Sequence, residues 1–256
     1  MNNVLSKQKI AENTFAIEVE NPELARKLGP AQFVLVRPKS GFSSLCVPVG
    51  EIKKNSFSFI AKGESTKFFS SLKKNDELND VIGPIGNRTA LEEIEQVCLI
   101  CDSHGIPMMY NLAKFYKDNK IRSSIVVTDK TKKMLYWEDK LKTIADILLI
   151  CTDDGSKGEK GPVYPHLRDL LGHMQYDIAI VSGSPLFMHE VANFTRQRIK
   201  TRAIVNPKML DPIGLSGTCR IKVDDKIKFA TIDGPTFNAH SIDFDELQQR
   251  IGKEFE

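Results

Sequence analysis

The residues best suited to metal or redox chemistry lie near the C-terminus, in a short glycine-rich segment. Asp211 opens the sequence DPIGLSGTCR, Cys219 nearly closes it, and a second stretch, FATIDGP, follows at 229–235. This layout is typical of an iron–sulfur ligand loop, but such clusters are normally held by four ligands, most of them thiolates. One thiolate and one carboxylate are too few, so the segment predicts a poor cluster site.

Two further cysteines, Cys98 and Cys101, have the C-x-x-C spacing that can signal metal or redox chemistry. They fall within the apolar run VCLIC, which predicts a strand, and strand positions three apart point to opposite faces. We therefore expect two small buried side chains rather than a metal site. The five histidines show no metal-ligand spacing, and no Ser-His-Asp or paired-carboxylate pattern is visible.

Short alternating segments, separated by Pro, Gly, Ser and Asn, make up the first 92 residues. Their period of two predicts strands, and several short strands at this spacing favour a small antiparallel β-barrel. Apolar residues at helical spacing also predict one short helix. The expected strands are 14–20, 32–37, 45–49 and 56–60, and the expected helix is 66–72.

From about residue 93 to 206 the pattern changes to alternating strands and helices. Continuous apolar strands between amphipathic helices predict a parallel sheet with helices on both faces, and such sheets bind ligands at the carboxyl ends of their strands. The last fifty residues predict a small lobe that ends in a helix. The expected strands are 97–101, 124–128, 147–152, 178–182 and 202–205, and the expected helices are 107–116, 134–141, 164–171, 186–198 and 244–251.

Composition narrows the class of protein. The chain has 256 residues, of which 41% are hydrophobic and 27% charged, as in typical globular proteins. The net charge of +3 is small and the 36 Lys and Arg residues are spread out, which favours neither nucleic acid nor a membrane surface as partner. Five scattered cysteines predict no disulfide framework, and together with the missing signal-peptide pattern they predict a cytoplasmic location.

Several short motifs occur in a fixed order along almost the whole chain. They are PAQFV (30–34), GESTK (63–67), GPIGN (83–87), TDDGS (152–156), VNP (205–207), DPIGLSGTCR (211–220) and DGP (233–235) with His240. In this order they resemble the ferredoxin reductase superfamily. The C-terminal motifs are similar to those of the dihydroorotate dehydrogenase electron-transfer subunit. They are more similar still to those of the small flavin subunit of electron-bifurcating ferredoxin:NADP oxidoreductases and sulfide dehydrogenases.

This resemblance implies a mixed fold of three parts. Residues 1–92 are expected to form a FAD-binding-type β-barrel, residues 93–206 a parallel, Rossmann-like NAD(P)-binding-type α/β domain, and residues 207–256 a small lobe related to a 2Fe–2S loop. The implied class is an oxidoreductase family member.

The flavin motif of the family is R-x-P-L-S/T, in which an arginine pairs with a flavin phosphate. The matching segment here is CVPVG (46–50), so Cys46 replaces the arginine and Gly50 replaces the hydroxyl residue. The basic residues Arg37 and Lys39 lie upstream and are alternative phosphate partners. The flavin-binding residues that the resemblance implies are Pro48, Gly63, Ser65 and Thr66. FAD therefore stays a candidate cofactor, bound by altered contacts.

The family's pyridine-nucleotide loop is rich in glycine, because the backbone must approach the pyrophosphate closely. The equivalent here is CDSHG (101–105), in which Asp102 adds a negative charge. We therefore expect weak or absent NAD(P)H binding, with the glycine turns serving the fold before any nucleotide. The nucleotide-binding residues that the resemblance implies are Gly105, Thr152, Asp153, Asp154 and Gly183.

At the cluster-binding end, the resemblance implies Asp211 and Cys219 as remaining metal ligands. Ser216 and Thr231 stand where the family has two further cysteines. Hydroxyl groups are much less acidic than thiols and are poor ligands for iron. An intact 2Fe–2S cluster is therefore not expected.

Two functional classes remain open. In the first, the chain is an electron-transfer subunit that binds FAD and passes electrons to a larger flavoprotein or iron–sulfur oxidoreductase subunit. In the second, it is a redox-silent structural or regulatory subunit that occupies the same position in such a complex without flavin or cluster.

Overall fold

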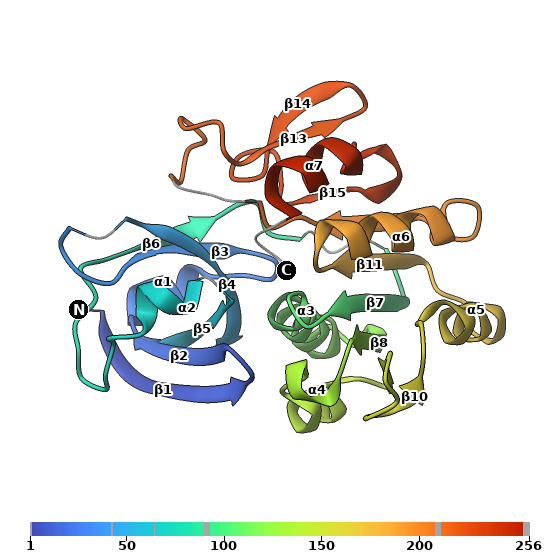
Figure 1. Cartoon of the computed structure of the whole chain (residues 1–256), viewed down its shortest axis with the longest axis horizontal. Helices are drawn as coiled ribbons and strands as arrows, with labels where there is room; N and C mark the ends of the chain where they lie inside the picture. The colour runs from blue at the N-terminus through green and yellow to red at the C-terminus, as the bar shows by residue number, and fades with distance from the viewer. Residues whose placement is uncertain (1, 42, 64, 90–92, 208–210, 253–256) are drawn as a thin grey trace.

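Two sheets account for most of the molecule and lie side by side (Figure 1). The computed structural model describes residues 2–41, 43–63, 65–89, 93–207 and 211–252. One sheet has six strands and the other seven, and a separate hairpin belongs to the C-terminal part of the chain. The expected mixed architecture, with one antiparallel and one mainly parallel sheet, is confirmed.

The six-stranded sheet is antiparallel throughout, in the order β1-β2-β5-β4-β3-β6. The backbone N–H of Val4, at the start of the sheet, donates to the carbonyl of Asp76, just before the last strand, at 2.8 Å. The two ends of the sheet therefore meet. Its strands are β1 (Asn3–Ala11), β2 (Thr14–Glu20), β3 (Phe33–Arg37), β4 (Leu45–Ile52), β5 (Ser56–Lys62) and β6 (Asp80–Ile85).

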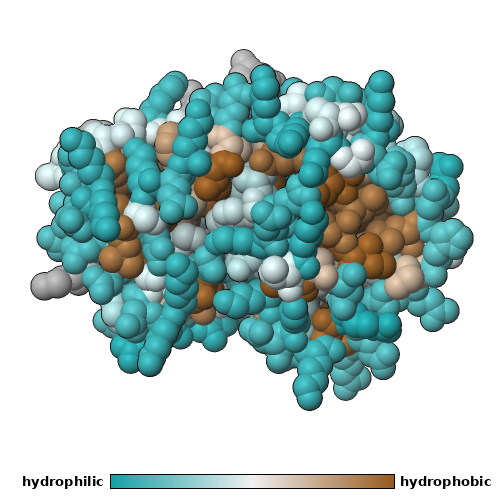
Figure 2. Space-filling view, turned by 90° about the horizontal axis from the view of Figure 1, so that it is seen from below, coloured by the Kyte–Doolittle hydropathy of each residue, from teal (hydrophilic) through white to brown (hydrophobic). Residues whose placement is uncertain are grey.

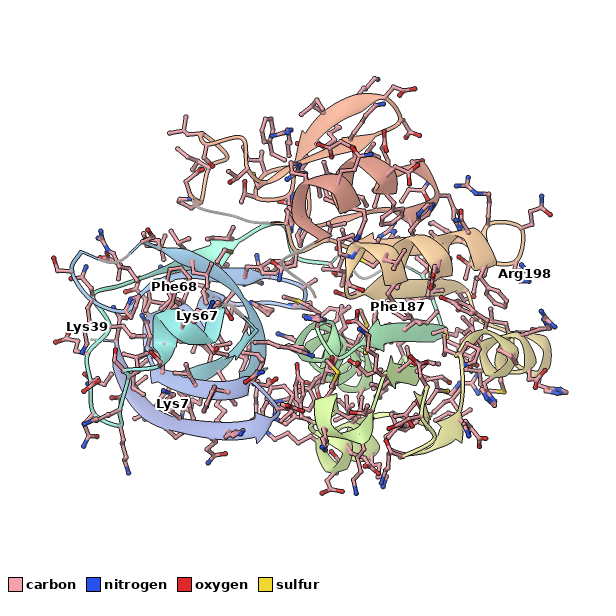
Figure 3. All side chains as sticks on the ribbon, viewed as in Figure 1. Lys7, Lys39, Lys67, Phe68, Phe187 and Arg198 are labelled. Atoms are coloured by element: carbon pink, nitrogen blue, oxygen red, sulfur yellow. The ribbon has the colours of Figure 1, made fainter. Side chains whose placement is uncertain are left out.

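Two short helices, α1 (Pro22–Lys27) and α2 (Ser65–Phe69), accompany this sheet, and α2 carries Lys67 and Phe68 (Figure 3). The Lys7 ammonium of β1 donates to the carbonyls of Phe69 and Ser70 at 2.8 and 2.7 Å. These bonds satisfy carbonyl groups that a helix end leaves without partners.

The seven-stranded sheet has the order β10-β9-β8-β7-β11-β12-β15 and is parallel except at β15. Every residue of β7 and β11 is buried and most are apolar, since helices cover a parallel sheet on both faces. The strands are β7 (Gln96–Asp102), β8 (Arg122–Asp129), β9 (Ile147–Thr152), β10 (Glu159–Lys160), β11 (Ile178–Ser182), β12 (Thr201–Ile204) and β15 (Thr236–Asn238).

Successive strands from β7 to β12, apart from β9 and β10, are connected by helices, as the crossovers of a parallel sheet require. Figure 1 shows α3 and α4 on the side that faces the six-stranded sheet and α5 on the opposite side. The connecting helices are α3 (Ile106–Asp118), α4 (Glu138–Ile144), α5 (Tyr164–His173) and α6 (Pro185–Thr195), with a 3-10 turn at Lys132–Met134.

The C-terminal part is joined to the large sheet rather than separate from it. Its hairpin consists of β13 (Arg220–Val223) and β14 (Lys226–Phe229), while β15 pairs with β12. A second 3-10 turn, Ala239–Ser241, leads to α7 (Phe244–Ile251), which packs against α6.

Two buried apolar clusters are present among the described residues; one lies within the six-stranded sheet and the other spans both sheets. Phe33, Leu35 and Cys46 of the six-stranded sheet belong to the same buried cluster as the strands β7 and β11. Residues 147–150 of β9, which lies next to the edge strand β10, stay partly exposed. Figure 2 shows apolar side chains gathering on the half of the underside that belongs to the seven-stranded sheet. Among the described residues, no helix is both long and apolar enough to cross a membrane.

Candidate functional site

A cleft of about 360 Å³ opens at the carboxyl ends of the parallel strands. This is the edge where sheets of this kind bind ligands. Val163 and Phe187 give its wall an apolar part on the side of α5 and α6, while most of its charged groups follow the strands β7, β8 and β9. The charged residues among those lining it are Asp102, Asp129, Lys130, Asp153 and Glu190.

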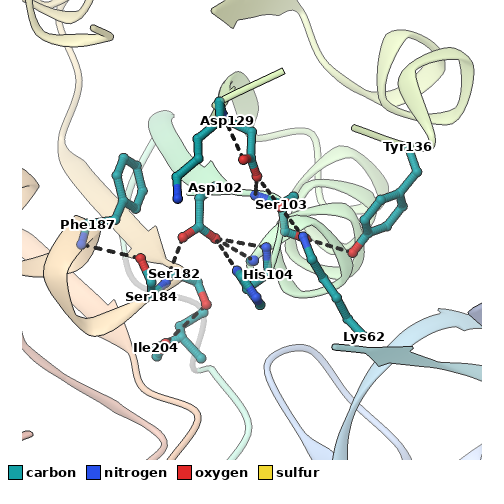
Figure 4. A network of polar contacts seen from close by, with 12 residues as sticks. Lys62, Asp102, Ser103, His104, Asp129, Tyr136, Ser182, Ser184, Phe187 and Ile204 are labelled. Atoms are coloured by element: carbon teal, nitrogen blue, oxygen red, sulfur yellow. Dashed lines mark hydrogen bonds and ion pairs between the residues drawn. The ribbon is translucent and has the colours of Figure 1, made fainter. Parts of the chain in front are cut away.

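The carboxylate of Asp102, the last residue of β7, is held by backbone N–H groups from two helix starts (Figure 4). It accepts hydrogen bonds from His104 at 2.8 Å, from Gly105 at 3.3 Å and from Ser184 at 2.7 Å. Gly105 is the N-cap of α3 and Ser184 is the N-cap of α6. Burial alone would raise the pKa of Asp102, but contacts with His104, the backbone of Ser184 and the charge of Lys62 lower it to about 2.

The two glycines predicted at this cleft, Gly105 and Gly183, are both packed against protein atoms. A side-chain Cβ at Gly183 would lie 2.6 Å from the carboxylate of Asp102, and one at Gly105 would overlap the carbonyl of Ser182. The structure therefore brings these two glycines together around Asp102. Their role in nucleotide binding stays a prediction, while their role in packing explains why each must be glycine.

A second hydrogen-bond network connects the cleft to the six-stranded sheet. The ammonium of Lys62, at the end of β5, donates to the hydroxyl of Ser103, which donates in turn to the carboxylate of Asp129 (Figure 4). The phenol of Tyr136 donates to the backbone carbonyl of Ser103 at 2.8 Å. Burial lowers the pKa of Lys62, while the charges of Asp129 and Asp102 oppose that shift. Sequence reasoning missed this network, because Lys62 and Asp129 are distant in the chain.

Turn 152–156 after β9 is organised mainly by its own hydrogen bonds. The hydroxyl of Thr152 donates to the carbonyl of Lys157 at 2.8 Å, and the carboxylate of Asp154 accepts from the hydroxyl of Ser156 at 2.6 Å. Asp153 is exposed and lines the cleft. Of the three residues predicted here, only Asp153 faces the place where a ligand would lie.

The predicted flavin turn at the end of β5 is more open. Gly63 has a positive φ of 58°, and none of the described residues outside its chain neighbours places an atom within 4 Å of a Cβ built there. The hydroxyl of Ser65 donates to the carbonyl of Lys62 at 2.8 Å, and that of Thr66 donates to the carbonyl of Gly63 at 2.7 Å. The turn holds its own shape, and no protein group fills the space beside Gly63 in the described residues.

Unlike the open turn at Gly63, the segment of β4 that matches the flavin motif is packed against other parts of the protein. Cys46 is 8% exposed, and burial, together with the nearby Cys219, raises the pKa of its thiol well above its ordinary value. Pro48 lies opposite Phe33 in the register of β3 and β4. A Cβ at Gly50 would lie 2.6 Å from the indole of Trp137. The glycine at position 50 therefore accommodates Trp137, so restoring a serine there would require the indole to move.

Trp137 is the single tryptophan of the chain and another residue that sequence reasoning missed. Its ring makes edge contacts with Tyr110 and Tyr136, at centroid distances of 5.2 and 5.7 Å. Lys140 lies 4.7 Å from the ring centroid and forms an ion pair with Glu51 of β4 at 2.7 Å. These contacts fix α4 against the six-stranded sheet. The available signal was that this lone tryptophan falls within the helix expected at 134–141.

The four positions of the C-terminal loop that would hold a cluster are hydrogen-bonded to one another in pairs. The hydroxyl of Ser216 donates to Asp211, whose carboxylate also accepts from the backbone N–H groups of Leu215 and Ser216, at 2.9 Å each. The thiol of Cys219 lies 3.3 Å from the hydroxyl of Thr231. Among the described residues there is no group of three or more His, Cys, Asp or Glu side chains that could hold a metal ion. The donor set, one thiol and one carboxylate already bonded to two hydroxyls, does not fit a 2Fe–2S cluster.

The remaining cysteines agree with the sequence-based expectation. Cys98 and Cys101 on β7 are completely buried, and burial raises the pKa of Cys98 to about 12. All five cysteines are buried and none forms a disulfide. The C-x-x-C spacing therefore reflects core packing.

The fold as a whole is shared with solved flavoprotein reductases. Phthalate dioxygenase reductase, with 16% identity and a TM-score of 0.59, covers 79% of this chain and 67% of its own. The structure of an NADH-dependent reduced ferredoxin-NADP oxidoreductase, studied for flavin-based electron bifurcation, matches with 32% identity and a TM-score of 0.91, over 99% of this chain and 93% of its own. These matches define a ferredoxin reductase-like protein.

The sequence relatives narrow the class. The dihydroorotate dehydrogenase B (NAD(+)) electron transfer subunit homolog of Thermotoga maritima is 33% identical over 99% of this chain and 91% of the relative. The electron transfer subunit of Bacillus cereus is 26% identical over 91% of this chain and 94% of its own. No family model matches the chain. The chain belongs to the family of dihydroorotate dehydrogenase B electron transfer subunits and their homologues.

Proposed function

We propose that this chain is the electron-transfer subunit of a flavoprotein oxidoreductase complex. The observation that carries the proposal is the full-length similarity, at 33% identity, to a relative named as an electron transfer subunit homolog. The solved structure with a TM-score of 0.91 belongs to an oxidoreductase that performs flavin-based electron bifurcation, which supports the same class. The partner in this proposal is a larger flavoprotein or iron–sulfur oxidoreductase subunit.

The three parts of the chain have separate roles in this proposal. Residues 1–92 form the FAD-binding-type barrel, residues 93–206 form the Rossmann-like domain, and residues 207–256 form a lobe derived from a 2Fe–2S domain. The meeting of β1 with the segment before β6 supports a closed barrel. The pairing of β15 with β12 ties the last part firmly to the second.

FAD is proposed to bind with its pyrophosphate at the turn of Gly63, Ser65 and Thr66, and the bound flavin would accept and release electrons. The open space beside Gly63 supports this placement. The usual cationic clamp on β4 does not fit, because Cys46 is a buried neutral thiol. Arg37 does not replace that clamp, since its guanidinium pairs with Asp80. Lys39 is exposed on the six-stranded half of the molecule (Figure 3) and remains available for altered contacts.

Neither a pyridine nucleotide nor a cluster is part of the proposal for this chain. Asp102 accepts the N–H groups that a pyrophosphate would need, and the loop of Asp211 and Cys219 lacks the thiolates that a cluster would need. Electrons would therefore enter and leave the flavin through the partner subunit.

The test is an absorption spectrum and a cofactor analysis of the full chain after anaerobic purification. We expect a yellow protein with one FAD per chain that survives gel filtration, and no iron above background. A colourless protein that takes up no added FAD would contradict the proposal and would support the redox-silent subunit instead. About two irons and two acid-labile sulfides per chain would overturn the assignment of the C-terminal lobe.

A further inference from the structure

The carboxylate of Asp102 has the surroundings of a bound anion. Backbone N–H groups at the start of α3 and at the start of α6 converge on it, with the shortest distances, 2.7 and 2.8 Å, coming from Ser184 and His104. Helix starts that converge in this way attract negative charge, because their N–H groups lack partners and the helix dipole is positive there. Here the anion is covalently part of the protein.

The fit around this carboxylate is close. Asp102 as a residue is 8% exposed, and its carboxylate occupies the volume that a Cβ at Gly183 would need. A phosphate that approached the same N–H groups would have to displace a carboxylate whose pKa is held at about 2, and which is therefore ionised at any physiological pH.

We propose that Asp102 sets the ligand selectivity of this cleft: its carboxylate takes the place of a ligand phosphate, so the cleft excludes phosphate-bearing ligands. The inference concerns the cleft of the seven-stranded sheet. The inference shares with the proposed function the exclusion of a pyridine nucleotide, but it does not depend on FAD binding to the other sheet. Pyrophosphate binding by wild type would therefore overturn this inference and leave the FAD assignment standing.

Occupancy of the N–H groups has to be distinguished from simple charge repulsion. Asp153 lines the same cleft and carries the same charge, but it takes no part in the hydrogen bonds from His104, Gly105 and Ser184. Repulsion alone would be relieved by neutralising either aspartate. Occupancy would be relieved only at Asp102, because only that change frees the N–H groups.

The experiment compares the full chain with Asp102→Ala and Asp153→Asn, using inorganic pyrophosphate as the probe in titration calorimetry. We expect Asp102→Ala to bind pyrophosphate about tenfold more tightly than wild type, or better, since the freed helix starts then face an anion. Asp153→Asn should bind as wild type does. Equal gains in the two variants would overturn the proposal in favour of repulsion, and pyrophosphate binding by wild type as tight as by Asp102→Ala would overturn it outright.

Asp102→Ala also removes an interaction that stabilises the fold, so a second readout is needed. Thermal unfolding with and without pyrophosphate measures binding to whatever fraction is folded. We expect pyrophosphate to raise the midpoint of Asp102→Ala and to leave that of wild type unchanged. Should the alanine variant not fold, Asp102→Gly, which also removes the side chain that accepts from the N–H groups, replaces it in the same measurement. A folded variant that gains no stability from pyrophosphate would contradict the proposal.

Discussion

Gly63 and Gly183 are both glycines that a resemblance to cofactor-binding motifs singled out, but different groups lie beside them. At Gly63 the space that a side chain would occupy is open among the described residues, and at Gly183 it is filled by the carboxylate of Asp102. The first glycine therefore leaves room for a ligand, and the second leaves room for the protein itself. A glycine in a ligand-binding motif is thus evidence of close approach, and the structure decides which group approaches.

The largest effect is expected from placing a charge at the open turn. Thr66→Asp should weaken FAD binding by about a hundredfold, because two like charges a few ångströms apart near a protein surface repel by several kcal/mol. Thr66→Asn is the matched control, since it has the same size without the charge, and it should keep most of the flavin. The FAD content after gel filtration measures both. Equal flavin content in the two variants would place the phosphate elsewhere.

The acid stability of the protein tests the filled cleft. The folded-state pKa of Asp102 is about 2 and lies below its ordinary value of 3.8, so its contribution is present above about pH 4 and is lost as pH falls toward 2. This difference corresponds to about 2.5 kcal/mol of unfolding free energy. Urea unfolding between pH 2 and 6 should show a shallower pH dependence for Asp102→Asn than for wild type. Identical slopes would mean that the carboxylate is not held as described.

A double-mutant cycle tests whether Gly183 is glycine because of Asp102. Gly183→Ala should destabilise the protein by about 1–3 kcal/mol, as overpacking does, because its Cβ would lie 2.6 Å from the carboxylate. In the background of Asp102→Ala the same change should cost much less. Unfolding free energies of the four proteins give the coupling. Additive effects would show that another neighbour restricts position 183.

The smallest effect is expected on the stability of the ligand-free protein, when Gly63 at the open turn is replaced by alanine. Gly63→Ala meets no described atom within 4 Å outside its chain neighbours, but it has a positive φ of 58°. The left-handed backbone should cost roughly 1–2 kcal/mol of stability. This cost should be the same with and without Asp102→Ala, in contrast to Gly183. Coupling between Gly63 and Asp102 would remove the distinction between the two turns.

Much of the fold follows from local patterns. The alternation in 14–20 and the apolar runs at 147–152 and 178–182 predict strands with the bounds that the structure has. The strand β1 was missed because its residues are largely polar and only partly buried, and it is stabilised by pairing with β2 and with the segment before β6. The helix expected at 134–141 begins four residues later, after Trp137 adopts a left-handed backbone.

The candidate site was predicted in part. The sequence indicated Asp102 as an obstacle at the phosphate approach, but it could not indicate that the N–H group of Ser184, 82 positions away, donates to the same carboxylate. The contact between Gly50 and Trp137 is also non-local, because it joins β4 of the six-stranded sheet to the start of α4. Such contacts depend on how the sheets pack, and no local pattern encodes them.

The most direct test of the account is to mix the FAD-loaded chain with NADH under anaerobic conditions and to follow flavin absorbance. If flavin binds at the open turn of Gly63 and Asp102 closes the cleft of the seven-stranded sheet, NADH cannot reach the flavin. We therefore expect the flavin of the isolated chain to stay oxidised in millimolar NADH, whereas a chemical reductant should bleach it at once. Rapid bleaching by NADH in the isolated chain would contradict the account.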